Sequence, residues 1–324
     1  MNIHLVQHKD IDKSAWDNCI GQAVNGNIYA FSWYLDIVCE EWDALISGDY
    51  ETVFPLTFRK KFGIWYLYQP FFTQQLGIFS ISHITPHIVE EFLSAIPQKY
   101  QFAEINLNAY NKPDKSKWQP TENLNHELDL IEPYEVLKKG YSQNTSRNIA
   151  KAIRNNISIS SSIKPEDIVH LFRQNKGKQF GHLTESDYRR FIRLAYECIV
   201  NRKAICYGAY TSENNLCAGA IVVFSHRKAI FLFSATDPVA KEKGAMFMLI
   251  DHFIQDLAGN HLTLDFEGSN DPSLARFYKS FGSDCVTYPG LRFNRLNLPS
   301  KLLNKAYKLT KKIYYKLMIN KKGP

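Results

Sequence analysis

Long apolar runs are absent from this sequence, although it is rich in apolar side chains. Of its 324 residues, 45% are hydrophobic and 14% are aromatic, which is enough to build large packed cores. No run approaches the roughly 18 apolar residues that a membrane-spanning helix needs. No N-terminal segment joins basic residues to a long apolar run, so we expect no signal peptide.

Cysteine is also sparse, and its spacing argues against disulfide and zinc sites. The six cysteines show no CxxC spacing and lie at Cys19, Cys39, Cys198, Cys206, Cys217 and Cys285. Scattered cysteines without a secretion signal are typical of reduced, mostly buried thiols, so we predict a cytoplasmic protein.

Catalytic and metal motifs of the common kinds are missing as well. No phosphate-binding loop occurs, and neither a Ser-His-Asp nor a Cys-His order can be read from the chain. The histidines His182, His226, His252 and His261 have no ligand spacing, so we predict no metal site.

Acidic residues are absent after Asp284. The ten lysines and arginines beyond it are Arg292, Arg295, Lys301, Lys305, Lys308, Lys311, Lys312, Lys316, Lys321 and Lys322. Because the formal net charge of the whole chain is +7, residues 1–284 carry −3. The basicity therefore belongs to one end, which favours an anionic partner there.

The end of the chain has the pattern of a basic amphipathic helix, which we predict over 300–324. Apolar residues recur at helical spacing between the lysines over 301–318. Such a helix could contact an anionic membrane peripherally or bind tRNA. Its apolar face could equally dock on the first domain.

The first part of the chain alternates short helices and strands, and Pro133 marks its end. Ser32 is expected to be the N-cap of a helix, and residues 59–63 form a basic turn between two strands. Helices are expected over 14–21, from Ser32, and over 86–96, and strands over 52–58, 64–68, 102–110 and 126–131. We predict a first domain over 1–133.

The second part has a similar order of elements, and we predict a second domain over 134–299. Helices are expected over 134–141, 145–156, 168–174, 186–201, 243–257 and 273–281, and strands over 157–163, 204–211, 216–225, 228–236, 261–266 and 287–293. This order predicts an α/β fold with a mixed sheet and helices on both faces. The repeated order indicates a duplicated fold.

One segment, Leu262 to Gly282, concentrates side chains with useful chemistry. An apolar strand ends in Asp265 and Glu267, and a compact helix after a polar turn carries Tyr278 and Lys279. Because the two carboxylates flank one residue of the strand, we expect them on the same side. One of them could be the base that deprotonates an acceptor amine. Alternatively, they cap the following helix or form a salt bridge with it.

Three stretches of the second part carry motifs of a known family. Residues 134–160 contain R-N-I-A-K-A at 147–152, which is close to the form R-x-x-I-x-K-A. Residues 245–268 lead into D-F-x-G, and residues 271–282 contain F-Y-K-S-F-G at 277–282, which is close to the form F-x-K-x-x-F-G. These stretches resemble the Fem peptidyl transferases and their relatives with a BioF2-like acyltransferase domain, within the GNAT acyltransferase superfamily. The resemblance covers about residues 125–290, and the first domain is compatible with it. It implies two tandem GNAT-like domains.

The resemblance also implies roles for residues of the Leu262–Gly282 segment. Tyr278 has the spacing of the GNAT tyrosine that acts as general acid to a departing thiolate, and a phenol with a pKa of about 10 suits that role. Lys279 falls on a Fem-type lysine that could stabilise an oxyanion or the phosphate of a tRNA end. Gly268 and Asn270, in the turn, are expected to contact substrate. The alternatives are a packed Tyr278 and a solvated Lys279.

A basic helix face is a candidate phosphate site. Arg147, Lys151 and Arg154 fall at i, i+4 and i+7, and guanidinium groups bind phosphate bidentately. We predict that this face binds a nucleotide-linked or tRNA substrate, although a solvated face is the alternative. The opposite, buried stripe is expected to comprise Ile149, Ala150 and Ile153.

The acetyl-CoA signature of the superfamily is degraded here. The matching residues, which we assign to cofactor binding, are Lys241, Lys243, Gly244 and Ala245. Met246 stands where a small residue would let the backbone approach the pyrophosphate. This departure weakens acetyl-CoA as the donor and favours aminoacyl-tRNA, and we expect no tightly bound cofactor.

These observations lead to two hypotheses. The first is a bacterial N-acyltransferase, cytoplasmic or peripheral at the inner face of the membrane. It would transfer an acyl or aminoacyl group from acyl-CoA or aminoacyl-tRNA to an amine of a nucleotide- or lipid-linked peptidoglycan precursor or other cell-envelope acceptor. The alternative is a non-catalytic binding module for tRNA, membrane or a glycan precursor, which the degraded cofactor motif favours. The carboxylates, phenol and ammonium gathered in one segment favour the enzyme.

Overall fold

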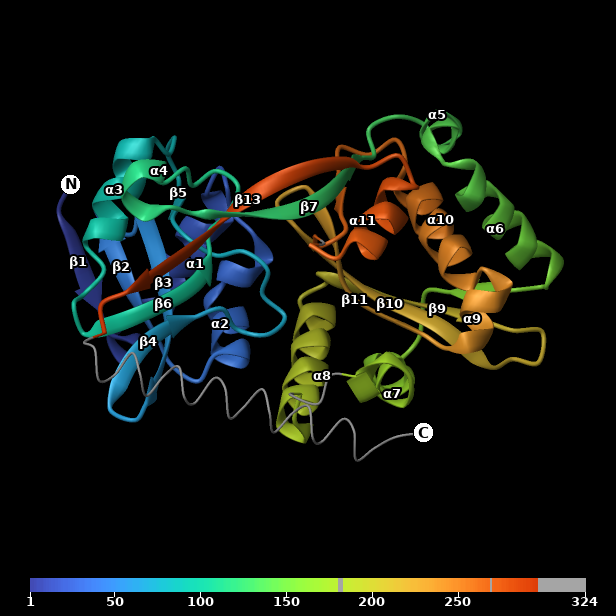
Figure 1. The fold of residues 1–324 in the computed structure, drawn as a ribbon, viewed down its shortest axis with the longest axis horizontal. Helices are drawn as coiled ribbons and strands as arrows, with labels where there is room; N and C mark the ends of the chain where they lie inside the picture. Colours follow the sequence, from blue (N-terminus) through green and yellow to red (C-terminus); the bar gives the residue numbers. More distant parts are fainter. Residues whose placement is uncertain (180–182, 269, 297–324) are drawn as a thin grey trace.

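A single mixed sheet runs through the protein, with helices on both of its faces (Figure 1). The computed structural model describes residues 1–179, 183–268 and 270–296. Among these residues the strand order is β1-β2-β3-β4-β6-β13-β7-β12-β11-β10-β9-β8, and β5 pairs with β3. The predicted mixed sheet with helices on both faces is therefore confirmed.

The N-terminal half comprises the elements up to β6. Its strands are β1 (Ile3–Val6), β2 (Trp42–Ser47), β3 (Thr52–Lys61), β4 (Ile64–Tyr68), β5 (Phe79–Ser80) and β6 (Tyr100–Asn106). Its helical elements are η1 (His8–Asp10), α1 (Lys13–Gln22), η2 (Ile28–Ala30), α2 (Ser32–Val38) and α3 (Pro86–Ser94). A short helix α4 (Lys115–Trp118) then leads into strand β7 (Thr121–Asp129).

The C-terminal half begins after β7. Its helical elements are α5 (Tyr134–Leu137), η3 (Lys138–Gly140), α6 (Gln143–Arg154), α7 (Pro165–Gln174), η4 (Lys176–Gln179), α8 (Glu185–Val200), α9 (Pro238–Lys243), α10 (Ala245–Leu257) and α11 (Pro272–Lys279). Its strands are β8 (Ser158–Ser160), β9 (Ala204–Tyr210), β10 (Leu216–Ser225), β11 (Lys228–Thr236) and β12 (Thr263–Asp265). The predicted antiparallel meander is present as β9-β10-β11.

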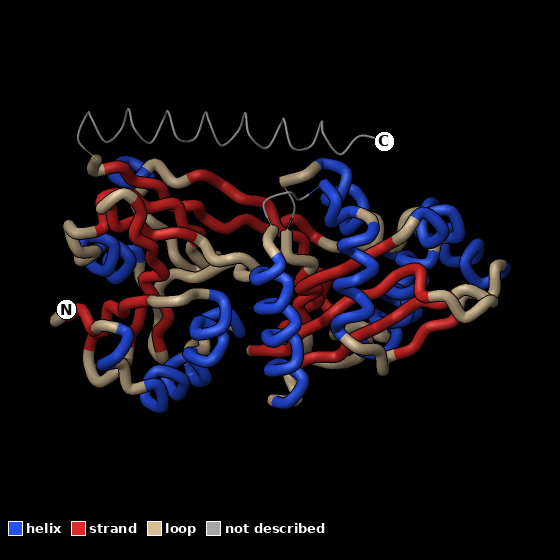
Figure 2. The backbone as a smooth tube through the Cα atoms, turned by 90° about the horizontal axis from the view of Figure 1, so that it is seen from below, coloured by secondary structure: helices blue, strands red, loops and turns tan. Residues whose placement is uncertain are grey.

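Two long strands join the halves. Strand β13 (Asp284–Asn294) pairs with β7 from Asp284 to Gly290 and with β6 from Gly290 to Asn294, while β7 also pairs with β12. Both views show strands passing from one half to the other (Figures 1 and 2). The sheet is thus continuous across residue 133, and the division into domains at that residue stays a prediction. The predicted helix over 300–324 lies outside the described residues.

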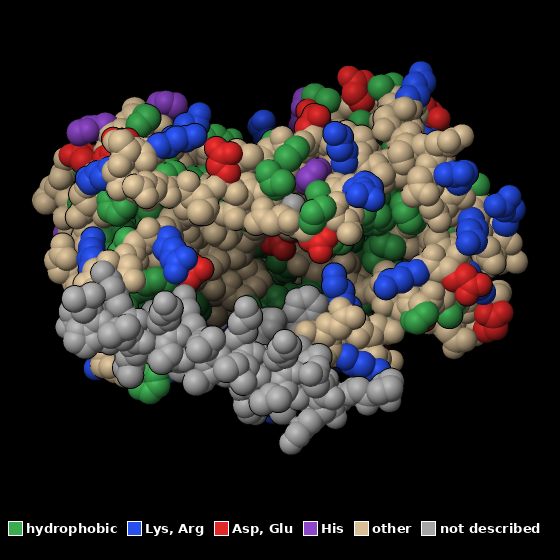
Figure 3. All heavy atoms as spheres, viewed as in Figure 1, with side chains coloured by type: hydrophobic (Ala, Val, Ile, Leu, Met, Phe, Trp, Pro, Cys, Tyr) green, Lys and Arg blue, Asp and Glu red, His purple; other side chains and the backbone are tan. Residues whose placement is uncertain are grey.

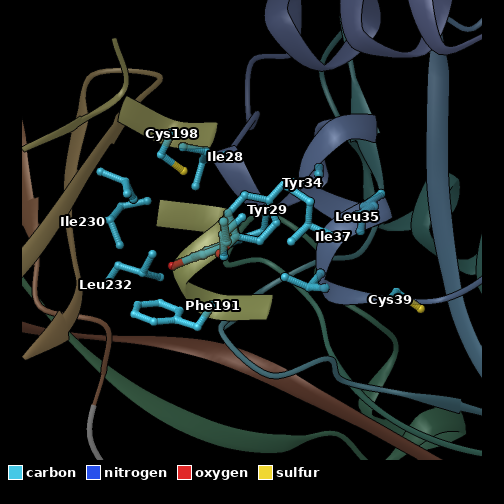
Figure 4. Packing of buried hydrophobic residues seen from close by; sticks show 14 of the residues in the cluster. Ile28, Tyr29, Tyr34, Leu35, Ile37, Cys39, Phe191, Cys198, Ile230 and Leu232 are labelled. Carbon is cyan, nitrogen blue, oxygen red and sulfur yellow. The ribbon is translucent and has the colours of Figure 1, made fainter. Parts of the chain in front are cut away.

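One hydrophobic core also spans both halves. Tyr29 and Tyr34 of the N-terminal half pack with Phe191 of α8 and with Ile230 and Leu232 of β11 (Figure 4). All five side chains are nearly or fully buried. A second core lies between the sheet and α6, α10 and α11, and a third lies between the N-terminal sheet and α3. Burial of this extent fixes the two halves against each other.

Several local predictions are wrong. Strands β1 and β2 were not predicted, and Phe31, not Ser32, occupies the N-cap of α2, where the Ser32 amide and hydroxyl donate to Asp17. Helix α10 begins at Ala245, two residues later than expected, because Gly244 in a left-handed conformation separates it from α9, which was not predicted. The basic turn is shorter than expected, because β3 continues to Lys61.

The buried stripe of α6 also differs from the prediction. Thr145, Ile149 and Ala152 are buried, whereas Ala150 and Ile153 are exposed. The helix is therefore rotated from the orientation expected. No helix among the described residues has the length and apolar character needed to cross a membrane.

Candidate active site

The candidate site lies where the two halves meet and where β11 and β12 separate. The two strands pair in parallel from Lys228–Thr263 to Ile230–Asp265, after which β11 continues to Thr236 while β12 ends. Figure 3 shows a hollow at the junction of the halves, with acidic side chains inside it. The turn after β12 brings Asp265 and Glu267 to this junction, because Glu267 contacts Tyr29 of the N-terminal half.

Asp265 is buried, and both of its carboxylate oxygens have partners. Its carboxylate accepts hydrogen bonds from Asn125 Nδ2 at 3.0 Å and from the Glu267 amide at 2.9 Å, and it pairs with Lys228 Nζ at 3.3 Å. Lys228 also pairs with Glu127 at 2.6 Å. Burial acts to lower the pKa of Lys228, but the charges of Asp265 and Glu127 outweigh it and raise that pKa. Asp265 is therefore held as part of a fixed charged network.

Glu267 differs from Asp265 because its carboxylate has a single described partner, the hydroxyl of Tyr29. Burial raises the pKa of Glu267 to about 8; the Tyr29 hydrogen bond opposes the rise, and the charge of Asp265 adds to it. The backbone of Glu267 has a φ of 56°, in the left-handed region that side chains rarely adopt. A carboxyl that titrates near neutral pH can accept a proton and release it again.

Two phenols from distant parts of the chain face these carboxylates. Tyr29 comes from η2 and Tyr288 from β13. Burial, followed by the charges of Glu267 and Asp265, raises the pKa of Tyr29 well above its ordinary value and that of Tyr288 to about 12. Both phenols therefore stay protonated near neutral pH and can donate hydrogen bonds toward the carboxylates.

Gly268 and Asn270 tie the turn to β7. The Gly268 amide donates to Asn125 Oδ1, and its φ is 58°. A methyl group at Gly268 would lie 2.6 Å from both Gln74 Nε2 and the Leu124 carbonyl oxygen, so the backbone needs glycine there. Asn270 accepts from the Leu124 amide at 3.0 Å and donates to Asn123 at 3.0 Å. Their contact with a substrate stays a prediction.

Helix α11 places Tyr278 and Lys279 close to the end of β12. The Tyr278 ring stacks on Phe266 with 4.8 Å between centroids, as the packing alternative expected. Its hydroxyl makes no hydrogen bond to another described residue, and burial followed by the charge of Glu267 raises its pKa well above 10. Lys279 is exposed and makes no ion pair with another described residue. A protonated phenol and an exposed ammonium thus stand on one short helix.

His126 belongs to the same neighbourhood and was not predicted. Its ring lies 6.3 Å from that of Tyr278, and its buried Nδ1 has no partner among the described residues. Burial, followed by the charge of Lys279, lowers the pKa of His126, so the ring is neutral near pH 7. His126 precedes Glu127 on β7, and only the pairing of β7 with β12 reveals its position.

The basic face predicted on α6 lies elsewhere. Arg147, Lys151 and Arg154 are exposed, and α10 lies between α6 and α11 in Figure 1. The structure therefore does not bring this face to the carboxylates. A phosphate-binding role for it stays a prediction.

The residues assigned to cofactor binding surround the junction of α9 and α10. Lys241 and Lys243 end α9, Gly244 has a φ of 77°, and Ala245 begins α10. A methyl group at Gly244 would lie 2.5 Å from the carbonyl oxygen of Asn148, so this glycine permits close packing of the junction against α6. Whether the junction also binds a cofactor stays a prediction.

Metal ligands do not gather among the described residues of the site. The described residues contain no group of three or more histidine, cysteine or acidic side chains placed to hold a metal ion. His182 lies outside the described residues. The chemistry that the described side chains can support is proton transfer by Glu267 and Tyr278, with positive charge from Lys279.

The sequence matches no family model and no curated protein, but the fold is similar to solved structures. The crystal structure of FemX superimposes with a TM-score of 0.66 over 94% of this chain and 99% of that chain, at 13% identity. The C-terminal domain of a candidate lysylphosphatidylglycerol synthetase from Agrobacterium fabrum gives 0.57 over 92% and 95%, at 11% identity. A conserved protein of unknown function from Bacteroides thetaiotaomicron gives 0.55 over 87% and 96%, at 9% identity. The predicted resemblance is thus confirmed at the level of the fold: this chain has a fold similar to that of FemX.

Proposed function

We propose that the protein is an N-acyltransferase that moves an acyl or aminoacyl group onto an amine, with Glu267 as the base. The observation that carries this proposal is the Glu267 carboxyl, buried at the junction of the halves with a pKa of about 8. The overall fold supports it, because it is similar to the fold of FemX and to that of a domain named as part of a lysylphosphatidylglycerol synthetase. The acceptor would be an amine of a cell-envelope precursor, lipid- or nucleotide-linked.

The proposed step needs one base and one acid. The amine nitrogen attacks the carbonyl carbon of the donor, a C–N bond forms, and the C–S bond of a thioester or the C–O bond of an ester breaks. Glu267 accepts the proton that the amine loses, and Tyr278 donates a proton to the leaving oxygen of an ester. Because the pKa of Tyr278 is raised well above 10, this phenol suits an ester oxygen better than a thiolate. Asp265 is unsuited to be the base, because Asn125 and Lys228 already engage its carboxylate.

Lys279 has an electrostatic part in this proposal. Its ammonium is exposed beside the end of β12, where it can approach an oxyanion or a donor phosphate. Charge stabilisation of this kind commonly contributes about 100-fold to 1,000-fold in rate. Holding the amine and the ester together at the junction contributes further by proximity.

The experiment is a transfer assay with both donor classes. The purified full chain is incubated with labelled acyl-CoA or labelled aminoacyl-tRNA and a mixture of cell-envelope precursors, and native mass spectrometry identifies any CoA or tRNA that co-purifies. We expect transfer by the wild type and by the exposed-surface variant Glu242→Gln, and none by Glu267→Gln. Absence of transfer and of both bound donors would instead support a binding module.

A further inference from the structure

The segment over 136–165, which contains α5, η3 and α6, carries positive charge without a single acidic residue. Glu135 precedes it and Glu166 follows it. The six cations inside it are Lys138, Lys139, Arg147, Lys151, Arg154 and Lys164. A run of one charge sign on a folded surface raises the local potential and favours an anionic partner.

Helix α6 presents three of these cations on one outer face. Ile149 and Ala152 pack into the core that α6 shares with α10, whereas Arg147, Lys151 and Arg154 are exposed. Because seven residues make almost two helical turns, Arg147 and Arg154 leave the helix on the same side, about 10 Å apart along its axis. Figure 1 shows α6 along the outer edge of the C-terminal half, away from the N-terminal half. The face is therefore held rigidly and points away from the rest of the protein.

The cations of this face have no counter-ion in the fold. Among the described residues, the arginines that form ion pairs with a carboxylate are Arg173 and Arg190. Arg147, Lys151 and Arg154 form none. Guanidinium groups bind phosphate bidentately, and three unpaired cations on one rigid helix can bind several phosphates at once.

Exposed apolar side chains accompany these cations. Ile153 is 59% exposed, and Ala150, on the turn between Arg147 and Arg154, is exposed as well. Val136, at the start of the segment, is 45% exposed. Cations beside exposed aliphatic side chains are typical of helices that lie in the interface of an anionic bilayer.

We propose that the outer face of α6, comprising Arg147, Ala150, Lys151, Ile153 and Arg154, docks the protein on an anionic lipid bilayer. The three cations then face lipid phosphates, and Ile153 enters the boundary between headgroups and acyl chains. A lipid surface fits better than a nucleic acid, because exposed aliphatic side chains add nothing to a phosphate-backbone contact. The face is also a convex helix and not a groove that tracks a strand. The proposal is independent of the proposed transfer reaction.

The test is co-sedimentation of the full chain with vesicles of phosphatidylcholine, with and without phosphatidylglycerol. We expect binding to the anionic vesicles. Arg147→Gln with Arg154→Gln should weaken it about 25-fold, since each cation near an anionic surface contributes roughly fivefold. Ile153→Gln should weaken it about threefold to fivefold, because insertion of the aliphatic side chain is lost while glutamine preserves the helix. All variants are made in the full chain, so any contribution from residues 297–324 is common to them.

Matched controls separate this face from general surface effects. Arg189→Gln with Arg193→Gln removes two exposed arginines from the surface of α8, and Val200→Gln removes an exposed aliphatic side chain from the same helix; neither should change binding. Equal binding by wild type and by Arg147→Gln with Arg154→Gln, equal binding to both vesicle types, or no binding at all would overturn the proposal. So would α6 variants that lose binding to bulk tRNA yet keep full binding to vesicles.

Discussion

Replacing Glu267 by glutamine should stabilise the protein increasingly as pH rises. The folded state raises the pKa of this carboxyl from 4.5 to about 8 and thereby favours its protonated form. The contribution of Glu267 to the free energy of unfolding is fully present below pH 4.5 and is lost as the pH rises to about 8. Because glutamine mimics the protonated form, the variant escapes this loss. Linkage gives a gain of about 1 kcal/mol at pH 5, about 3 kcal/mol at pH 7 and about 5 kcal/mol at pH 9.

Urea unfolding followed by tryptophan fluorescence at these three pH values measures the gain. Glu242→Gln, on the exposed surface of α9, is the control and should show no gain that grows with pH. The same Glu267→Gln variant should lose transfer activity, so stability and activity should change in opposite directions. A gain that is equal at pH 5 and pH 9, or a loss at pH 9, would refute a buried carboxyl that titrates near neutral pH.

Three further substitutions test the neighbouring residues. Tyr29→Phe removes the hydrogen bond that lowers the pKa of Glu267, so that pKa should rise. The midpoint of the rising limb of the pH–activity profile, expected at about pH 8, should therefore shift to higher pH, and an unchanged midpoint would show that Tyr29 does not act on Glu267. Lys279→Ala should reduce kcat/KM about 100-fold or more while the melting temperature stays unchanged, and retained activity would exclude Lys279 from the mechanism. Gly268→Ala should destabilise the protein by about 2–3 kcal/mol in urea unfolding, because the new methyl group would clash with a carbonyl oxygen and sit at positive φ; wild-type stability would contradict that reasoning.

The sequence was most informative where local patterns determine structure. The β9-β10-β11 meander and the helices around Pro86 and Tyr278 carry strong alternation, turn residues or proline at a helix start, and these elements appear in the structure. Strand β2 was missed because it is buried on both faces, so no alternation of polar and apolar side chains marks Trp42–Ser47. Gly244 gave a visible signal, since glycine inside a helical pattern often ends a helix.

The candidate site was only partly predictable for a different reason. Asp265 and Glu267 are separated by one residue, so their proximity follows from the sequence, although β12 ends at Asp265 and Glu267 lies in the turn beyond it. Tyr29, by contrast, is 238 positions from Glu267 along the chain, and no local pattern links them. His126 and Tyr288 likewise reach the site through β7 and β13, whose pairing across the chain has no local sequence signature.

Strand β13 has a consequence for how the chain folds during synthesis. It inserts between β6 and β7, so both of those strands keep one unpaired edge until residues 284–294 have left the ribosome. An N-terminal fragment that ends near residue 133 would expose these edges to other nascent chains. Native pairing here joins segments nearly 190 residues apart, which makes folding slow. We expect this protein to need protection from aggregation until β13 is in place.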